Sequence, residues 1–149
     1  LIFTLMVQTF KKLLFTSIFA FLFNLAWEVS HSPLYKTMTD MTASQYVPRI
    51  LQSSGGDILM ILLIFFGISL ANQTLKWKLS KKNIFLSIIF GMMIAIAFEL
   101  YAQYTNRFEY NSSMPLIPLL RVGLTPVLQM MITPLLAFFF AEKITRADN

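Results

Sequence analysis

Apolar residues dominate this chain in four long windows, which are separated by shorter polar stretches. Each window is close to the roughly 20 residues that an α-helix needs to cross about 30 Å of hydrocarbon. The pattern predicts an all-α fold, a polytopic bundle of four transmembrane helices. The expected spans lie at about 13–31, 57–75, 83–105 and 118–141. They occupy most of the chain, so we expect one membrane domain over 1–149 and no separate soluble domain.

The connections between the spans carry the turn-forming residues. Residues 32–56 and 106–117 are predicted loops on one side of the membrane, and 76–82 is a Lys-rich loop on the other. Prolines and glycines in 32–56 indicate a structured surface loop with one short interfacial helix. Ser54-Gly55-Gly56-Asp57 matches a Ser-x-x-Asp capping box, which predicts that the second helix begins there.

Small and polar residues follow one helical stripe of the first span, while the rest of its surface is mostly Phe and Leu. In a bilayer, small residues allow close helix contact and polar residues seek partners inside the bundle, so this stripe should face inward. The third span has a second stripe of the same kind. The stripes comprise Ser17, Ala20, Asn24, Glu28 and His31 in the first span, and Ser87, Gly91, Ala95, Glu99 and Ala102 in the third.

The last predicted span contains two prolines, Pro126 and Pro134. A proline inside a helix removes one backbone hydrogen bond, so we expect a kink with freed carbonyl oxygens. Arg121, Thr125 and Gln129 recur at four-residue steps. In a continuous helix this spacing predicts a polar ladder that descends from the membrane surface.

Composition supports the membrane assignment. The chain is 56% hydrophobic and 13% charged, with a mean hydropathy of +0.66, which is too apolar for an ordinary soluble domain. The net charge of +5 does not indicate nucleic acid, because the basic residues sit in short loops beside the spans. By the positive-inside rule we expect a multi-pass protein of the cell membrane with both termini cytoplasmic. The basic residues on the cytoplasmic side would be Lys11, Lys12, Lys76, Lys78, Lys81, Lys82, Lys143 and Arg146.

The polar residues near the outer boundary define a candidate site. At 1.5 Å per residue from the basic ends, Glu28 and Glu99 lie at a similar depth, about 24 Å along their helices. Ionisable groups at this depth are costly to leave unpaired, so they mark either a functional site or pairs that hold helices together. We predict acid/base roles for Glu28, His31 and Glu99. The candidate ligand-binding residues are Asp57, Arg107, Arg121, Gln129, Tyr104 and Asn24.

Metal and covalent chemistry receive little support from the motifs. Glu28-x-x-His31 has the spacing of half a di-iron site, but His31 is the single histidine and such sites need two of these motifs. We therefore expect no metal site, and no motif indicates a cofactor. The chain contains no cysteine, which excludes thiolate nucleophiles, and no nucleophile elbow accompanies its serines.

Three function classes remain. The first is an outward-facing site that binds or processes a lipid-like or small amphipathic ligand, with catalysis left open. The second is a small transport subunit that works as an oligomer. The third is a structural or assembly factor whose polar cluster only holds the helices together. The expected partners are membrane lipids, with a homo-oligomer or a larger membrane complex as further options.

Overall fold

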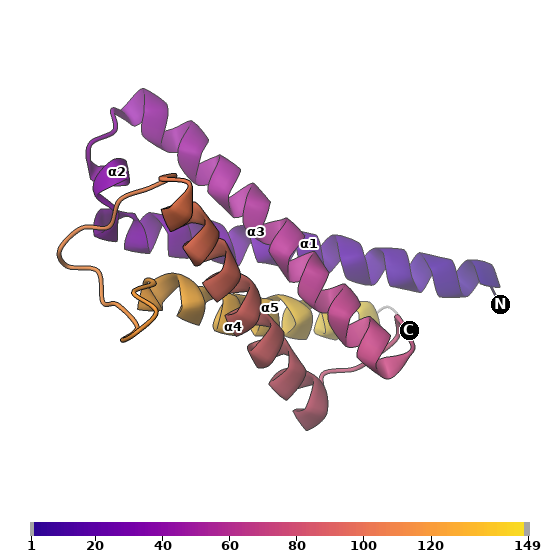
Figure 1. Ribbon diagram of the computed structural model, residues 1–149. Coiled ribbons are helices and arrows are strands. Elements are labelled where there is room, and N and C mark those ends of the chain that lie inside the picture. Colours follow the sequence, from indigo (N-terminus) through magenta and orange to yellow (C-terminus); the bar gives the residue numbers. More distant parts are fainter. Residues whose placement is uncertain (1, 148–149) are drawn as a thin grey trace.

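The computed structural model describes the backbone of residues 2–147 and the side chains of residues 6–146. Four long helices make up most of the chain, and a short helical segment follows the first of them (Figure 1). The elements are α1 (Ile2–His31), the 3-10 turn η1 (Ser32–Leu34), α2 (Lys36–Thr39), α3 (Ala43–Asn72), α4 (Lys81–Tyr104) and α5 (Leu124–Ala147).

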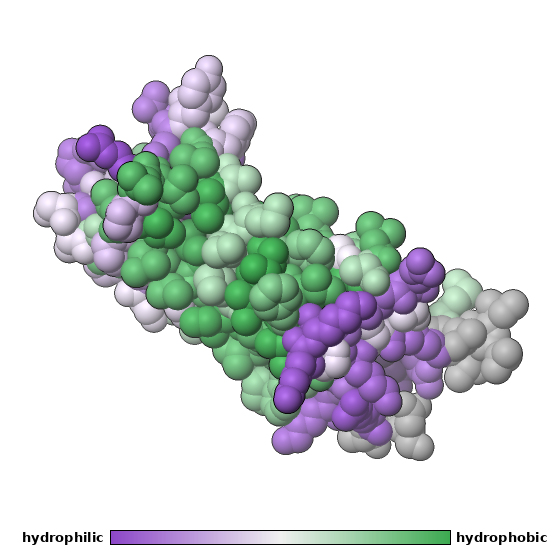
Figure 2. Space-filling view, turned by 60° about the horizontal axis from the view of Figure 1, so that its bottom comes forward, coloured by the Kyte–Doolittle hydropathy of each residue, from purple (hydrophilic) through white to green (hydrophobic). Residues whose placement is uncertain are grey.

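All four long helices are long and apolar enough to cross a membrane, with stretches at Met6–Leu34, Ala43–Asn72, Lys81–Tyr104 and Leu124–Arg146. On the face shown in Figure 2, a mostly apolar band lies between two polar ends. The predicted all-α four-helix fold is therefore confirmed, and the protein is a multi-pass membrane protein.

The helices form a ring in which each one has two main neighbours. α1 packs against α3 and α5, α4 packs against the same two helices, and α3 and α5 touch only slightly across the bundle. In Figure 1, α1 and α5 run side by side and α3 and α4 cross them. The apolar core between them includes Phe65 and Phe138, whose side chains are fully buried. Many other large apolar side chains are exposed, such as Leu59, Leu70 and Phe85, as expected where lipid replaces water.

The small-residue stripe of α4 lies against its neighbours, as the sequence predicts. Gly91 is the point of closest approach, because a Cβ built on it would lie 1.9 Å from the backbone oxygen of Met130 on α5. Pro134 has no N–H, so this oxygen lacks its usual i+4 donor in the helix. The freed carbonyl predicted for the last span therefore exists, and a Cα hydrogen of Gly91 points at it.

The start of α3 differs from the prediction. The helix begins at Ala43, so residues 43–56 are helical and were wrongly predicted as loop. The capping box is formed by Thr42 and Gln45, whose side chains satisfy each other's backbone amides. The Ser54-x-x-Asp57 pattern instead lies in mid-helix, where the Ser54 hydroxyl donates to the carbonyl of Ile50. A capping-box pattern occurs both at Thr42-x-x-Gln45 and at Ser54-x-x-Asp57, and only the first copy caps the helix.

The start of α5 also differs from the prediction. Residues 115–123 form an irregular turn with a bridge between Leu116 and Gly123, and α5 begins only at Leu124. Arg121 lies in this turn with φ of 54° and its side chain is exposed. The predicted ladder from Arg121 down to Gln129 is therefore wrong, because no helix connects them. Pro126 falls in the first turn of α5, where its missing N–H has no helical partner to lose.

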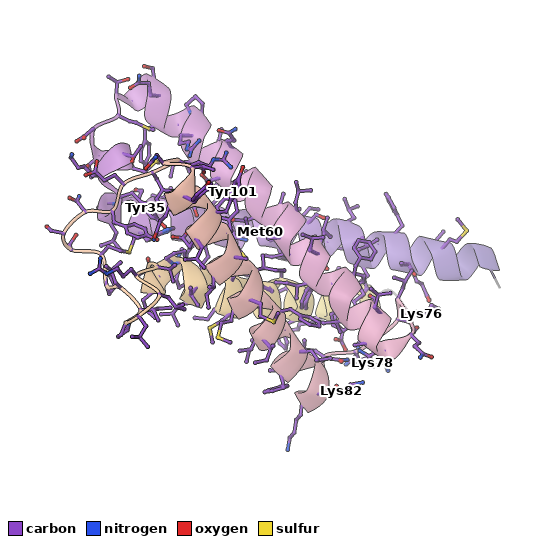
Figure 3. The ribbon with its side chains drawn as sticks, viewed as in Figure 1. Tyr35, Met60, Lys76, Lys78, Lys82 and Tyr101 are labelled. Carbon is purple, nitrogen blue, oxygen red and sulfur yellow. The ribbon has the colours of Figure 1, made fainter. Side chains whose placement is uncertain are left out.

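The two ends of the bundle have different characters (Figure 3). We call the end that carries Lys76, Lys78 and Lys82 the lysine end, and the end formed by residues 32–42 and 105–123 the loop end. At the lysine end, the buried Lys12 ammonium donates to the carbonyl of Trp77 and lies 4.0 Å from the centroid of the Trp77 ring. This contact ties the α3–α4 loop to α1.

Candidate functional site

A cavity of about 290 Å³ opens between the helices at the loop end. Its lining comes from all four long helices and from the two connections above them. The polar lining includes Glu28 from α1, Asp57 from α3, Glu99 from α4 and Gln129 from α5. Three carboxyl groups that are widely separated in the sequence thus border one space.

Gln129 joins two of these carboxyl groups. Its side-chain nitrogen lies 2.8 Å from Asp57 Oδ2, 3.1 Å from Glu28 Oε1 and 2.9 Å from Asn24 Oδ1. An amide nitrogen has only two hydrogens, so it cannot serve all three acceptors at once. Thr133 donates its hydroxyl hydrogen to the same Asn24 oxygen, at 3.0 Å. With Thr133 on Asn24, the two amide hydrogens are left for Asp57 and Glu28.

Glu99 has a different partner. The Tyr110 hydroxyl donates to Glu99 Oε2, while it accepts hydrogen bonds from the backbone N–H of Gly123 at 2.9 Å and from Gln103 Nε2 at 3.2 Å. Burial, together with the bond to Glu99, raises the pKa of Tyr110 to about 12. The hydroxyl therefore keeps its proton near neutral pH and remains a donor to the carboxyl group.

The loop end is closed by two connections that bind each other. Asn111 donates its backbone N–H to the carbonyl of Leu34 at 2.8 Å, and Lys36 donates to the carbonyl of Glu109 at 2.9 Å. Tyr35 lies at the centre of this contact, buried against the rings of His31, Phe108 and Tyr110, with centroids 5.1 to 5.6 Å away. These contacts hold an aromatic cover over the acidic part of the cavity.

Two arginines line the cavity nearer to its loop-end side. Arg49 projects from the first turns of α3, and Arg107 follows α4. A Schellman motif at the end of α4 positions Arg107. The backbone N–H of Arg107 donates to the carbonyl of Ala102, and the backbone N–H of Asn106, which has φ of 52°, donates to the carbonyl of Gln103. The Arg107 side chain is exposed, whereas Arg49 is half-buried.

The opposite charges around the cavity do not pair with one another. Within the part of the chain that the structure describes, no Lys or Arg nitrogen forms an ion pair with Glu28, Asp57 or Glu99. His31 lies beside Glu28, with Nε2 4.0 Å from Glu28 Oε1. Of the two alternatives for these ionisable groups, the pairs that would hold helices together are therefore not formed by Lys or Arg among the described residues.

Four other predicted site residues do not line the cavity: His31, Asn24, Arg121 and Tyr104. His31 is buried beside Glu28 but outside the cavity lining, with Nδ1 2.8 Å from the carbonyl of Trp27. Asn24 lies one layer deeper and reaches the cavity through Gln129. Arg121 contributes its backbone carbonyl, which accepts from Gln103 at 2.9 Å, and not its guanidinium. Tyr104 is 87% exposed and does not line the cavity.

Several lining residues were missed by the sequence analysis. Arg49 lies in the predicted loop 32–56, and its position at the cavity follows only from the start of α3 at Ala43. Tyr35 lies in one predicted loop and Tyr110 in the other, and nothing in the sequence pairs Tyr110 with Glu99 across ten intervening residues. The apolar lining, which includes Met60 and Met130, carries no sequence signal that separates it from other core positions.

No group of three or more His, Cys, Asp or Glu side chains suited to a metal ion occurs among the residues that the structure describes. Comparisons with known protein families, with curated proteins and with solved structures find no match. The geometry of the cavity is therefore the basis on which a function can be argued.

Proposed function

We propose that the protein binds a small amphipathic or lipid-like ligand in the cavity at the loop end. The observation that carries this proposal is the cavity itself, which places apolar and polar lining side by side between the four helices. The apolar part of the ligand would contact Met60, Ala95 and Met130, and its polar part would contact the carboxyl groups and Gln129.

The lining supports an amphipathic ligand in particular. Met60 and Ala95 lie about one helical turn further from the loop end than Asp57 and Glu99, so the cavity changes from apolar to polar along its length. Methionine side chains adapt to ligands of irregular shape, and binding sites commonly combine an apolar lining with a few convergent polar groups. A ligand with one apolar and one polar end matches this order.

A purely structural role makes a different prediction for the same residues. A polar cluster that only holds helices together should satisfy its members and leave no space between them. Here the second carboxyl oxygens of Glu28 and Asp57 have no hydrogen-bond partner among the described residues, and a cavity of about 290 Å³ borders the cluster. These two features favour a binding site over a structural staple.

Native mass spectrometry of gently purified protein tests this proposal. We expect a retained ligand in the wild type that is lost in Ala95→Leu, because the larger side chain fills the cavity. Ala97→Leu is the matched control, since it makes the same change on the same helix at an exposed position outside the cavity lining. Both variants can be checked for folding by circular dichroism.

The outcomes separate the two roles. Loss of the bound mass in Ala95→Leu, with retention in Ala97→Leu, supports the cavity as a binding site. A wild-type protein that carries no added mass, even after incubation with total membrane lipid, contradicts the proposal and favours the structural alternative. Bound mass that both variants retain places the ligand on the outer apolar surface and also contradicts it.

A further inference from the structure

We propose that the ligand is a zwitterionic amphiphile, with an ammonium group among the buried carboxyl groups and an acidic group on the two arginines beyond them. This inference rests on the proposed function and specifies the chemistry of the ligand's head. Its basis is the order of three chemically distinct layers along the cavity.

The first step concerns unsatisfied acceptors. Glu28, Asp57 and Glu99 each use one carboxyl oxygen in the hydrogen bonds described above. The second oxygen of each has no hydrogen-bond partner among the described residues. Asp57 is only 8% exposed, and yet it borders the cavity with this free oxygen. Each carboxyl group thus has one donor but no Lys or Arg ion-pair partner among the described residues. A buried charge without a counter-ion is costly, and a ligand with N–H donors or positive charge would reduce that cost.

The second step concerns the aromatic cover. Tyr35 and Phe108 line the cavity beside the carboxyl groups, and Phe98 adds a third ring from α4. Aromatic faces attract ammonium groups through the ring quadrupole, and carboxylates attract them through charge. Together, the rings and the three carboxyl groups suit an organic cation. An anionic head at the same depth would instead be repelled by them.

The third step concerns the arginines. Arg49 lies eight residues from Asp57 along α3, which places its backbone about 12 Å towards the loop end, and its long side chain lines the same cavity as Asp57. The Arg107 side chain has no hydrogen-bond or ion-pair partner in the described part of the chain, and Arg49 bonds only Gln52, at 3.4 Å. Guanidinium groups bind carboxylate and phosphate with two parallel hydrogen bonds. The arginines therefore present donors for an acidic group that lies beyond the ammonium.

The order of the layers predicts the order of groups in the ligand. Along α3, Met60 is deepest, Asp57 follows about 4.5 Å later, and Arg49 is nearest the loop end. A ligand that matches all three has its apolar part first, its ammonium next and its acidic group last. Alkyl betaines have this order, whereas alkylphosphocholines carry the two charges in reverse. A simple cation would leave the arginines unmatched.

The test compares three probes at equal mole fraction in dodecyl maltoside micelles: N-dodecyl-N,N-dimethylglycine, dodecyltrimethylammonium and dodecylphosphocholine. Binding is followed through the ¹³C-methyl resonance of Met60, which lines the cavity. We expect the betaine to bind at least tenfold more tightly than either of the others. An N-butyl betaine that binds equally well would support the same head while identifying a small soluble ligand in place of a lipid-like one.

Paired variants assign the two charges. Glu28→Gln with Asp57→Asn should weaken the betaine and the cation at least tenfold, and both changes keep the shape of the side chain. Arg49→Gln with Arg107→Gln should weaken the betaine and leave the cation unchanged. Lys36→Gln with Glu109→Gln is the control, because it removes an ion pair at the same end whose members are exposed and outside the cavity.

Failure of this inference can be told apart from failure of the proposed function. If all three probes bind with similar affinity and Ala95→Leu abolishes their binding, the cavity binds amphiphiles but the zwitterionic assignment is wrong. Tighter binding of dodecylphosphocholine than of the betaine overturns the order of charges. If Ala95→Leu changes the affinity of no probe, both proposals are contradicted.

Discussion

Replacement of Gly91 by alanine tests the packing on which the cavity depends. Alanine normally stabilises a helix by about 0.5–1 kcal/mol relative to glycine. At this position the new Cβ would lie 1.9 Å from the backbone oxygen of Met130, whereas carbon and carbonyl oxygen ordinarily approach to about 3.3 Å. The obstacle is backbone, which cannot rotate away as a side chain can. α4 and α5 must therefore separate by more than about 1 Å.

The expected cost follows from these two opposing terms. Overpacking of a close contact costs about 1–3 kcal/mol, which exceeds the gain in helix propensity. Gly55→Ala provides the reference, because nothing lies within 4 Å of a Cβ at that position in α3 and only the favourable term applies. Because both variants gain the helix-propensity term, we expect Gly91→Ala to be less stable than Gly55→Ala by the overpacking cost, about 1–3 kcal/mol.

The free energy of unfolding can be measured by SDS titration in mixed micelles, with Trp27 and Trp77 fluorescence as the signal. Circular dichroism before the titration checks that each variant retains its helices. If Gly91→Ala is as stable as Gly55→Ala, then α4 and α5 do not make this backbone contact, and the packing described here is incorrect.

Three further predictions concern individual polar contacts. Gln129→Leu should lower the free energy of unfolding by about 2–4 kcal/mol, because it leaves two buried carboxyl groups without their donor; an unchanged value in the same titration would refute the network. The pKa of Tyr110 is raised in the folded protein, so its contribution to stability is present below pH 10 and is lost between pH 10 and about 12. The free energy of unfolding of Tyr110→Phe should therefore fall less over that pH range than that of the wild type. Equal falls in the two proteins would contradict this. Lys12→Met should blue-shift or brighten the emission of Trp77 by removing the cation over its ring, and an unaltered spectrum would count against the contact.

The sequence predicted the fold because the bilayer imposes simple requirements. A helix must be apolar for about 20 residues, and a stripe of small residues must face its neighbours. The stripe Ser87, Gly91, Ala95, Glu99 and Ala102 is buried as predicted. The depth argument also brought Glu28 and Glu99 to one level, and both line the same cavity.

The wrong predictions concern helix ends and charge partners, which the bilayer does not determine. Helix termini depend on local capping, and the Thr42–Gln45 box could not be distinguished in advance from Ser54-x-x-Asp57. The turn before α5 depends on tertiary hydrogen bonds, such as that from the N–H of Leu124 to the carbonyl of Pro115 at 2.7 Å. The places of the charged side chains depend on where these helices begin. Arg49 lies within α3 and lines the cavity, whereas Arg121 lies before the start of α5 and does not.

The central claim is that an amphipathic ligand occupies the cavity between the four helices. Intermolecular nuclear Overhauser effects from ¹³C-methyl methionine in deuterated detergent test it most directly. Met60 and Met130 line the cavity, whereas Met93 is 59% exposed on the apolar surface. We predict effects from the bound ligand to Met60 and Met130 that disappear in Ala95→Leu. Effects to Met93 alone, unchanged in that variant, would show that the ligand lies outside the bundle and would contradict this account.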